Sequence, residues 1–482
     1  MIITSSSGPK CRVALSCLPG MLAALLVASS SGCGASGGGA TAPSGGSDAS
    51  SASDAGSPPS FDASESASTV QDSSVADRGA PPPNDAASAL PPDAKTVADS
   101  NSDSDTDTDA DSTASSGPFP FAPSFILGAD ISWASQHEAE GYTYSDGISV
   151  KPMEEIMANN GFNFIRLRTF VQPSASGGYA PGSAEQAGVP GYGTSTGGWC
   201  STADTVAKVV RMKKCGLGVL VDFMMSDTWA SIGGQTMPSS WVGLSQTVPA
   251  TPVSASTHDD NIYQAAHDYV AGVMQALVAA GAKPDMVQIG NESNGGMSGI
   301  ELDDPAAFVA LVNAGIKAVR ETDPKIIVWA QNGRPRPNSA GGDNFDGWVD
   351  DYLSGKSPYD PAIDEDGICG STYGTTDKGA DWTTCFTYVF TTYSKPVMSC
   401  EYTDVSPNGS GGALINGIMR GFPDHWGRGS FIWEPADYPA VNATGTLFTL
   451  TGKVYATNSA MTAYPTLAKS YGLPVPSGSC GQ

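Results

Sequence analysis

Two adjoining segments carry most of the information on the fold: Tyr263-Gln-Ala-Ala-His-Asp-Tyr-Val-Ala-Gly-Val-Met-Gln-Ala-Leu-Val-Ala-Ala-Gly281 and Met286-Val-Gln-Ile-Gly-Asn291. The first has apolar residues at helical spacing and ends at Gly281, a residue suited to the position after a helix. The second is a short apolar run, typical of a strand that is buried on both faces. A further helical pattern over residues 305–320 opens with a proline in its first turn. This order predicts βα units and a parallel sheet.

The same alternation of strand and helix patterns continues from residue 121 onward. The strand candidates are residues 125–130, 162–168, 218–223, 286–291, 326–330, 367–371, 396–400 and 430–434. Eight such units over roughly 360 residues fit an α/β fold of the (β/α)8 TIM-barrel class, whose core needs about 250 residues. A doubly wound sheet is the alternative, and in that fold fewer of the acidic residues that follow the strands would lie at one common face.

The part of the chain before the barrel has a different composition. Residues 1–33 have the layout of a signal peptide, with Lys10 and Arg12 before a short apolar run. The residues before Cys33 resemble a bacterial lipobox with Ser30 where leucine is usual, so a lipid anchor at Cys33 and simple cleavage both stay open. Residues 34–120 are rich in Ser, Ala, Asp, Gly and Pro and bury too little apolar surface to fold. We expect a disordered tether there and a catalytic barrel domain over 121–482.

The negative charge of the chain limits which kinds of molecule it can bind. The formal net charge is -25, and the tether carries much of it. The sequence lacks a Lys/Arg cluster with interleaved aromatic residues, so nucleic acid is not expected as a partner. A polyanionic ligand, a charged polysaccharide included, would be repelled, which favours a neutral one. We expect a monomer that is secreted or held on a bacterial cell surface, with an outer-membrane lipoprotein as one form.

The cysteines favour disulfide bonds. Of nine, Cys11 and Cys17 lie in the signal and Cys33 is the candidate lipid site. An even set remains, which in an exported chain favours disulfides over zinc: Cys200, Cys215, Cys369, Cys385, Cys400 and Cys480. Cys200 and Cys215 flank one helical segment and are expected to pair. The other pairings stay open.

Polar residues follow the predicted strands. They are Asp130, Arg168, Asp222, Asn291, Glu292, Glu401 and Trp433. In a (β/α)8 barrel the carboxyl ends of the strands converge on one face, where active sites lie. Any one of these acids alone is more simply explained as a helix cap or loop anchor. Two glutamates at one mouth, however, have the residue types that glycosidic bond cleavage requires, without metal or cofactor.

The neighbours of the two glutamates suggest their roles. Asn291 can donate to a sugar 2-hydroxyl, Trp433 can offer an apolar platform, and Arg166 or Arg168 can orient Glu401 and keep it ionised. Glu292 would be the acid, with a raised pKa. Carboxyl groups about 5–5.5 Å apart would imply retention of configuration, and a wider gap inversion. The four histidines lie in predicted loops or helices and form no apparent catalytic triad or metal site.

Five blocks of the sequence resemble, in order, the signature blocks of glycoside hydrolase family 53. They are Gly128-Ala-Asp-Ile-Ser-Trp-Ala-Ser-Gln-His-Glu-Ala-Glu-Gly141, Gly161-Phe-Asn-Phe-Ile-Arg-Leu-Arg168, Asp222-Phe-Met-Met-Ser-Asp-Thr-Trp-Ala230, Pro284-Asp-Met-Val-Gln-Ile-Gly-Asn-Glu292 and Phe431-Ile-Trp-Glu-Pro-Ala436. The resemblance implies a retaining arabinogalactan endo-β-1,4-galactanase that acts on plant cell-wall galactan. It implies Glu292 as the acid/base after Asn291, and Glu401 as the nucleophile. It also implies glycan-contacting or site-orienting roles for Asp130, Trp133, Arg168, Asp227, Trp229 and Trp433.

Two departures from the family pattern bear on the substrate. Met224 and Met225 stand where the family usually has His-Tyr, which removes an imidazole near the cleaved sugar. The sixth-strand region is reduced to Gly370-Ser-Thr-Tyr-Gly374, which leaves Tyr373 as the aromatic residue that can hydrogen-bond the nucleophile. Another neutral β-glycan, mannan or glucan, is therefore an alternative substrate, and a catalytically silent glycan-binding surface protein is an alternative function. Some relatives hold a structural calcium ion, but its ligands cannot be matched here.

Overall fold

The computed structural model describes residues 125–175, 178–179, 198–337, 345–353, 362–374, 379–404, 406, 408–437, 447–476 and 479–480. The predicted signal peptide and tether lie outside these residues, and both stay predictions. Among the described helices, none combines the length and apolar character needed to cross a membrane.

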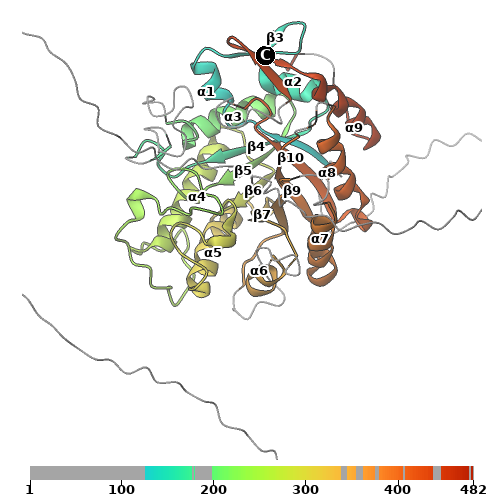
Figure 1. The fold of residues 1–482 in the computed structure, drawn as a ribbon. Coiled ribbons are helices and arrows are strands. Elements are labelled where there is room, and N and C mark those ends of the chain that lie inside the picture. The colour runs from blue at the N-terminus through green and yellow to red at the C-terminus, as the bar shows by residue number, and fades with distance from the viewer. Residues whose placement is uncertain are drawn as a thin grey trace, which may run out of the picture. The chain divides into compact units, whose positions relative to one another are not determined.

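A closed barrel of parallel strands forms the centre of the described chain (Figure 1). The strand order around it is β1-β10-β9-β8-β7-β6-β5-β4. The bounds are β1 (Ile126–Asp130), β4 (Phe164–Thr169), β5 (Gly218–Phe223), β6 (Met286–Ile289), β7 (Ile327–Asn332), β8 (Gly367–Ser371), β9 (Val397–Tyr402) and β10 (Gly427–Trp433). Each overlaps one strand expected from the sequence, so the (β/α)8 fold is confirmed.

Helices surround the barrel, as Figure 1 shows. They are α1 (Ala134–Ala139), α2 (Met153–Asn159), α3 (Thr202–Lys214), α4 (Ile262–Ala279), α5 (Pro305–Thr322), α6 (Phe345–Tyr352), α7 (Gly379–Tyr393), α8 (Ser410–Gly421) and α9 (Tyr464–Ser470). Both helices expected from periodicity are present as α4 and α5. The Asn261 side chain caps α4, Asp304 caps α5, and Gly281 has a φ of +66° just beyond α4.

Side chains along the strands alternate between the barrel interior and the helix layer. The interior layer is apolar and consists of Ile126, Phe164, Leu220, Met286, Ile327, Trp329, Cys369, Met398, Cys400 and Phe431. Their neighbours along the strands, such as Leu127 and Val221, belong to the larger core shared with the helices. At Gly128 an added Cβ would lie 2.4 Å from the Phe431 ring, so glycine makes room for that ring. This filled layer closes the barrel below its mouth.

A small second sheet with the order β11-β12-β2-β3 was not expected. It consists of β2 (Thr143–Ser145), β3 (Val150–Lys151), β11 (Phe448–Thr451) and β12 (Val454–Thr457), and the parallel β2–β12 pair joins segments from the two ends of the domain. Its strands are two to four residues long, too short to produce a recognisable period-two pattern.

Disulfide bonds within the predicted set of cysteines are confirmed, but the expected pairing of Cys200 with Cys215 was wrong. The bonds link Cys215 to Cys480 and Cys369 to Cys400, while Cys200 is free and buried. Cys200 precedes α3 and Cys215 follows it, so the 13-residue helix holds them at opposite ends. At 1.5 Å per residue that helix is about 20 Å long, whereas the Cα atoms of a disulfide lie within about 7 Å.

Candidate active site

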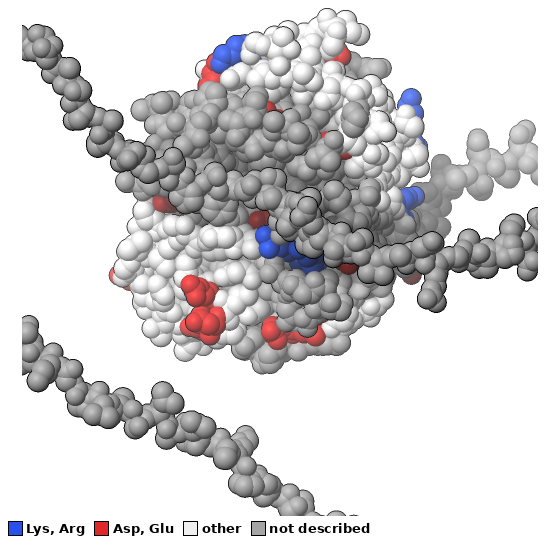
Figure 2. Space-filling view, viewed as in Figure 1, with Lys and Arg blue, Asp and Glu red and all other residues white. Residues whose placement is uncertain are grey.

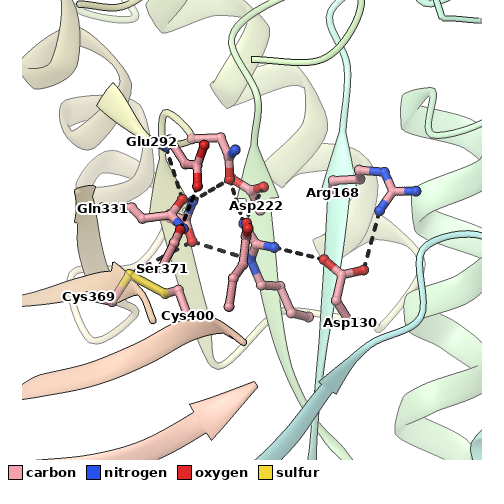
Figure 3. Close-up of polar contacts among 12 residues, drawn as sticks. Asp130, Arg168, Asp222, Glu292, Gln331, Cys369, Ser371 and Cys400 are labelled. Carbon is pink, nitrogen blue, oxygen red and sulfur yellow. Dashed lines mark hydrogen bonds and ion pairs between the residues drawn. A yellow bond between two sulfur atoms is a disulfide. The ribbon is translucent and has the colours of Figure 1, made fainter. Parts of the chain in front are cut away.

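Above the apolar layer, the next inward positions of the strands carry polar side chains. They are Asp130, Arg166, Arg168, Asp222, Gln288, Gln331, Ser371 and Glu401, all buried. Arg168 follows the inward Arg166 by two positions, and each of the other six residues before Glu401 follows an inward apolar or glycine residue by two, as strand alternation requires. The barrel thus brings residues from seven strands to one mouth, and Figure 3 shows several of them pointing toward one another.

Arg166, on β4, is the centre of this polar layer. Its Nη1 donates to Asp130 Oδ2 at 2.8 Å, and its Nη2 lies 2.9 Å from Asp222 Oδ2 and 2.8 Å from Glu401 Oε1. Nη2 also donates to Asn291 Oδ1 at 2.7 Å. Of the two arginines left open by the sequence, Arg166 is therefore the partner of Glu401. A planar guanidinium can hold several carboxylates in fixed directions at once.

Glu401 is held through both carboxylate oxygens. Arg166 contacts Oε1, and the Tyr373 hydroxyl donates to Oε2 at 2.9 Å. Both contacts stabilise negative charge on Glu401. Although 37% of the Tyr373 surface is exposed, burial of its phenol oxygen, followed by the Glu401 charge, raises the pKa of Tyr373 above its ordinary value, so the phenol keeps the proton that it donates.

Glu292 has different surroundings. Its Oε1 accepts from the Ser371 hydroxyl at 2.7 Å, and its Oε2 accepts from the Ile232 amide at 3.2 Å. Burial and then the nearby Glu401 charge raise the pKa of Glu292 to about 7. The proton-bound form therefore persists near neutral pH. The two glutamates lie in one mouth but differ in their partners, because Glu401 contacts a guanidinium and a phenol, whereas Glu292 contacts a hydroxyl and a backbone amide.

The backbone at Glu292 is unusual. Its φ of 44° lies in the left-handed region, which costs a residue other than glycine about 1–3 kcal/mol. Two glutamines hold this conformation. Gln331 Oε1 accepts from the Glu292 amide at 3.1 Å, and Gln235 Nε2 donates to the carbonyl oxygens of Asn291 and Glu292. Such strain at a buried polar site is typical of functional positions.

The protein holds Asn291 through both polar atoms of its side-chain amide. Its Oδ1 accepts from Arg166, and its Nδ2 donates to the Ala230 carbonyl at 2.7 Å. The second hydrogen of that amide group remains for a sugar hydroxyl.

An aromatic cluster occupies another side of the mouth. Trp133 lies edge-on to Trp433 and Trp229, with ring centroids 5.4 and 6.1 Å away. Arg168 Cζ lies 4.4 Å from the Trp229 ring centroid and 5.1 Å from that of Trp133. Trp133 and Arg168 are fully buried, whereas Trp229 and Trp433 are partly exposed. Trp229 and Trp433 can therefore meet a ligand, and Arg168 supports them from below.

Glu434 completes this cluster, and no role was predicted for it. Its Oε1 accepts from Arg168 Nη1 at 2.6 Å and from the Trp133 amide at 3.1 Å. Its φ of 37° is also left-handed. Burial raises its pKa to about 8. The signal that could have identified it is its place one residue after Trp433, within an expected strand.

Asp227 anchors loops in this structure. Its Oδ1 accepts from the Gln172 amide at 2.9 Å, and its Oδ2 accepts from the backbone and hydroxyl of Ser239 at 2.8 and 2.7 Å. Met224, in the same block, is buried with 2% of its surface exposed.

Sequence reasoning overlooked Gln288, Gln331 and Ser371, although each follows an inward strand residue by two positions. In the described parts of the chain, His, Cys, Asp and Glu form no group of three or more that could hold a metal ion.

A (β/α)8 barrel with two carboxyl groups in one polar mouth is the architecture of a glycoside hydrolase. The family model described as glycosyl hydrolase family 53 matches residues 126–417, and the chain belongs to this family.

Relatives support this assignment. The chain is 31% identical over 232 residues to an uncharacterized protein in the bgaB 5′ region of Niallia circulans, covering 46% of this chain and 52% of that protein. It is 27% identical over 345 residues to an endo-beta-1,4-galactanase of Bacillus subtilis (strain 168), covering 65% of this chain and 71% of that one. The match thus spans about half the length of the first relative. The solved GH53 catalytic domain of Ignisphaera aggregans shares the fold, with a TM-score of 0.56, 22% identity and coverage of 72% of this chain and 97% of that domain.

Proposed function

We propose that the chain is an endo-acting, retaining glycoside hydrolase that cleaves β-1,4-galactosidic bonds in (arabino)galactan, with Glu292 as acid/base and Glu401 as nucleophile. One observation carries the proposal. Arg166 and Tyr373 hold Glu401 in surroundings that favour negative charge, while burial raises the pKa of Glu292 in the same mouth. Glycosidic cleavage by double displacement needs this division between a charged nucleophile and a protonated acid.

In the first step, protonated Glu292 donates its proton to the glycosidic oxygen as the bond to the leaving sugar breaks. A Glu401 oxygen attacks the anomeric carbon and forms a covalent glycosyl ester. The Asn291 amide can donate to the sugar 2-hydroxyl, a hydrogen bond that strengthens as positive charge develops on the ring.

In the second step, the ester leaves no charge on Glu401. Because that charge is the second-largest cause of the raised pKa of Glu292, its loss lowers the pKa. The Ser371 hydroxyl and the Ile232 amide then stabilise the Glu292 carboxylate. Glu292 takes a proton from water, the water oxygen attacks the anomeric carbon, and Glu401 leaves as a carboxylate.

A neutral glycan suits the partly exposed aromatic residues of the site. On the face seen in Figure 2, the described surface is mostly uncharged, with small separate groups of acidic and basic residues. The partly exposed Trp229 and Trp433 can pack against the apolar face of a sugar. The Bacillus subtilis relative named endo-beta-1,4-galactanase supports galactan as the substrate.

The experiment is hydrolysis of linear β-1,4-galactan, β-1,4-mannan and cellulose by the purified chain, with products separated by size. Galactan should give a ladder of oligosaccharides, and proton NMR of the first products should show the β-anomer. Cleavage of mannan or glucan without galactan would overturn the substrate assignment. An initial α-anomer would overturn retention, and binding without cleavage of any glycan would overturn the enzyme.

A further inference from the structure

Strand β9 breaks its own alternation at the position that places Glu401. Met398 and Cys400 belong to the apolar interior layer, while Tyr402 belongs to the core shared with the helices. In a regular strand, Glu401 would point away from the interior, opposite to Cys400. It instead contacts Arg166 inside the mouth. Two consecutive residues therefore face the interior.

A β-bulge at Cys400 explains this. On the β8 side, Gly370 pairs with Ser399 and Ser371 pairs with Glu401, so β9 has one extra residue. On the β10 side, Ser430 pairs with Ser399 and Ile432 with Tyr402, with a register shift between the two pairs. The extra residue between Ser399 and Glu401 is Cys400. Bulges of this kind redirect the side chains that follow them.

The bulged residue is covalently fixed to the next strand. Cys400 forms a disulfide with Cys369 of β8. Cys369 lies two residues before Ser371, on the same face of β8, and the Ser371 hydroxyl donates to Glu292. Figure 3 shows the disulfide directly beside Ser371, with Gln331 and Glu292 beyond it. A single bond thus ties the strand that carries Glu401 to the strand that supports Glu292.

We infer that the Cys369–Cys400 disulfide is a positioning element of the active site, which holds the bulge that aims Glu401 into the mouth and keeps Ser371 on Glu292. The inference rests on the proposed roles of the two glutamates. Without the bond, β9 can shift by one residue to regular pairing, which would turn Glu401 toward the apolar helix layer. Even a displacement of about 1 Å at the reacting groups can lower the rate about 100-fold.

The simpler alternative is that this disulfide only stabilises the fold by restricting the unfolded chain. The two accounts differ in their effect on a chain that is still folded. A bond that only stabilises leaves kcat unchanged below the unfolding temperature, whereas a positioning bond lowers kcat there.

The test compares two double variants, Cys369→Ala/Cys400→Ala and Cys215→Ala/Cys480→Ala. The second removes the bond between the C-cap of α3 and Cys480, at the opposite end of α3 from the mouth, and serves as the matched control. A third variant, Cys369→Ala/Cys400→Val, replaces part of the lost volume without a cross-link. Galactan hydrolysis is measured at a temperature where circular dichroism shows all the proteins folded.

We expect both variants at Cys369 and Cys400 to lose about 10- to 100-fold in kcat with little change in KM, while the control keeps the wild-type kcat. In the free protein, 13C NMR of the glutamate carboxyls should show a lower pKa for Glu292, because the Glu401 charge raises that pKa more than the Ser371 hydrogen bond lowers it. Wild-type kcat in both variants would overturn the inference. So would their failure to fold while the control folds, since the bond would then be a folding requirement.

Failure of the proposed function would give a different experimental result from failure of this inference. It appears in the unmodified protein as absence of galactan cleavage, whatever the variants do. Failure of the inference alone appears as an active wild type with equally active variants and an unchanged Glu292 pKa.

Discussion

Arg166 Nη2 and Glu401 Oε1 lie 2.8 Å apart, although 235 positions separate these residues in the chain, and the Arg166 side chain is fully buried. The same guanidinium contacts Asp130, Asp222 and Asn291. The contact therefore joins the candidate nucleophile to residues from three other strands or strand ends. A residue buried in the barrel thus holds the side chain that is proposed to react with the substrate.

Arg166→Met should lower both stability and activity. The substitution leaves carboxylates buried without their cation, which costs about 3–5 kcal/mol of unfolding free energy. Urea denaturation measures the stability loss, and hydrolysis of galactan measures the activity loss. Lys283→Met is the control, because Lys283 pairs with Asp323 at the surface and such pairs contribute about 0–1 kcal/mol. Equal losses in the two variants would contradict a central role for Arg166.

Glu401→Ala and Glu292→Gln should each lower kcat. Loss of the nucleophile removes the covalent route, and loss of the acid removes a contribution of about 100- to 10,000-fold. Both proteins should still bind galactan, which isothermal titration calorimetry measures. Azide should restore turnover in Glu401→Ala with the α-glycosyl azide as product. Glu321→Gln is the matched control and should keep wild-type kcat, because Glu321 lies on α5, where its side chain contacts His267 of α4.

The pH profile of kcat/KM should have a basic limb near pH 7. Burial raises the pKa of Glu292 to about 7, so its acidic proton is present below that pH and is lost as the pH rises through it. Ser371→Ala removes a donor that favours the carboxylate and should move this limb upward by about one pH unit. Thr391→Ala, on the exposed face of α7, should leave it in place. A limb that does not move would show that another group titrates.

Trp433→Ala should raise KM for galactan by about 2- to 12-fold, because an aromatic contact contributes about 0.5–1.5 kcal/mol. Trp433→Phe should restore much of the affinity. Trp426, which stacks on Phe390 near the start of β10, is also partly exposed, and Trp426→Ala is the control. A greater rise in KM from the control would contradict the platform role.

Glu434→Ala should destabilise the protein by about 3–5 kcal/mol, because it removes the carboxyl partner of buried Arg168. Thermal unfolding measures this loss. Glu138→Ala, at the exposed end of an ion pair, should change stability by less than about 1 kcal/mol. A Glu434→Ala protein as stable as the control would show that Asp130 and the Trp229 and Trp133 rings are enough to support Arg168.

Prediction from the sequence succeeded where local periodicity carries the information. The barrel strands and the helices α4 and α5 follow from runs and repeats that are readable within one segment. Strand alternation also explains why Arg166, Gln288 and Gln331 face inward, and a stricter use of it would have found the two glutamines. The short sheet containing β2 and β12 left no such pattern.

The amino-acid sequence by itself determined the barrel and the presence of two glutamates at its strand ends, because hydrophobic spacing specifies which residues form strands and which follow them. Only the tertiary structure decided that Arg166 rather than Arg168 contacts Glu401, and that Cys400 pairs with Cys369. It also decided that a bulge turns Glu401 inward. These features depend on the register between strands that are distant in the chain, and no single segment encodes that register.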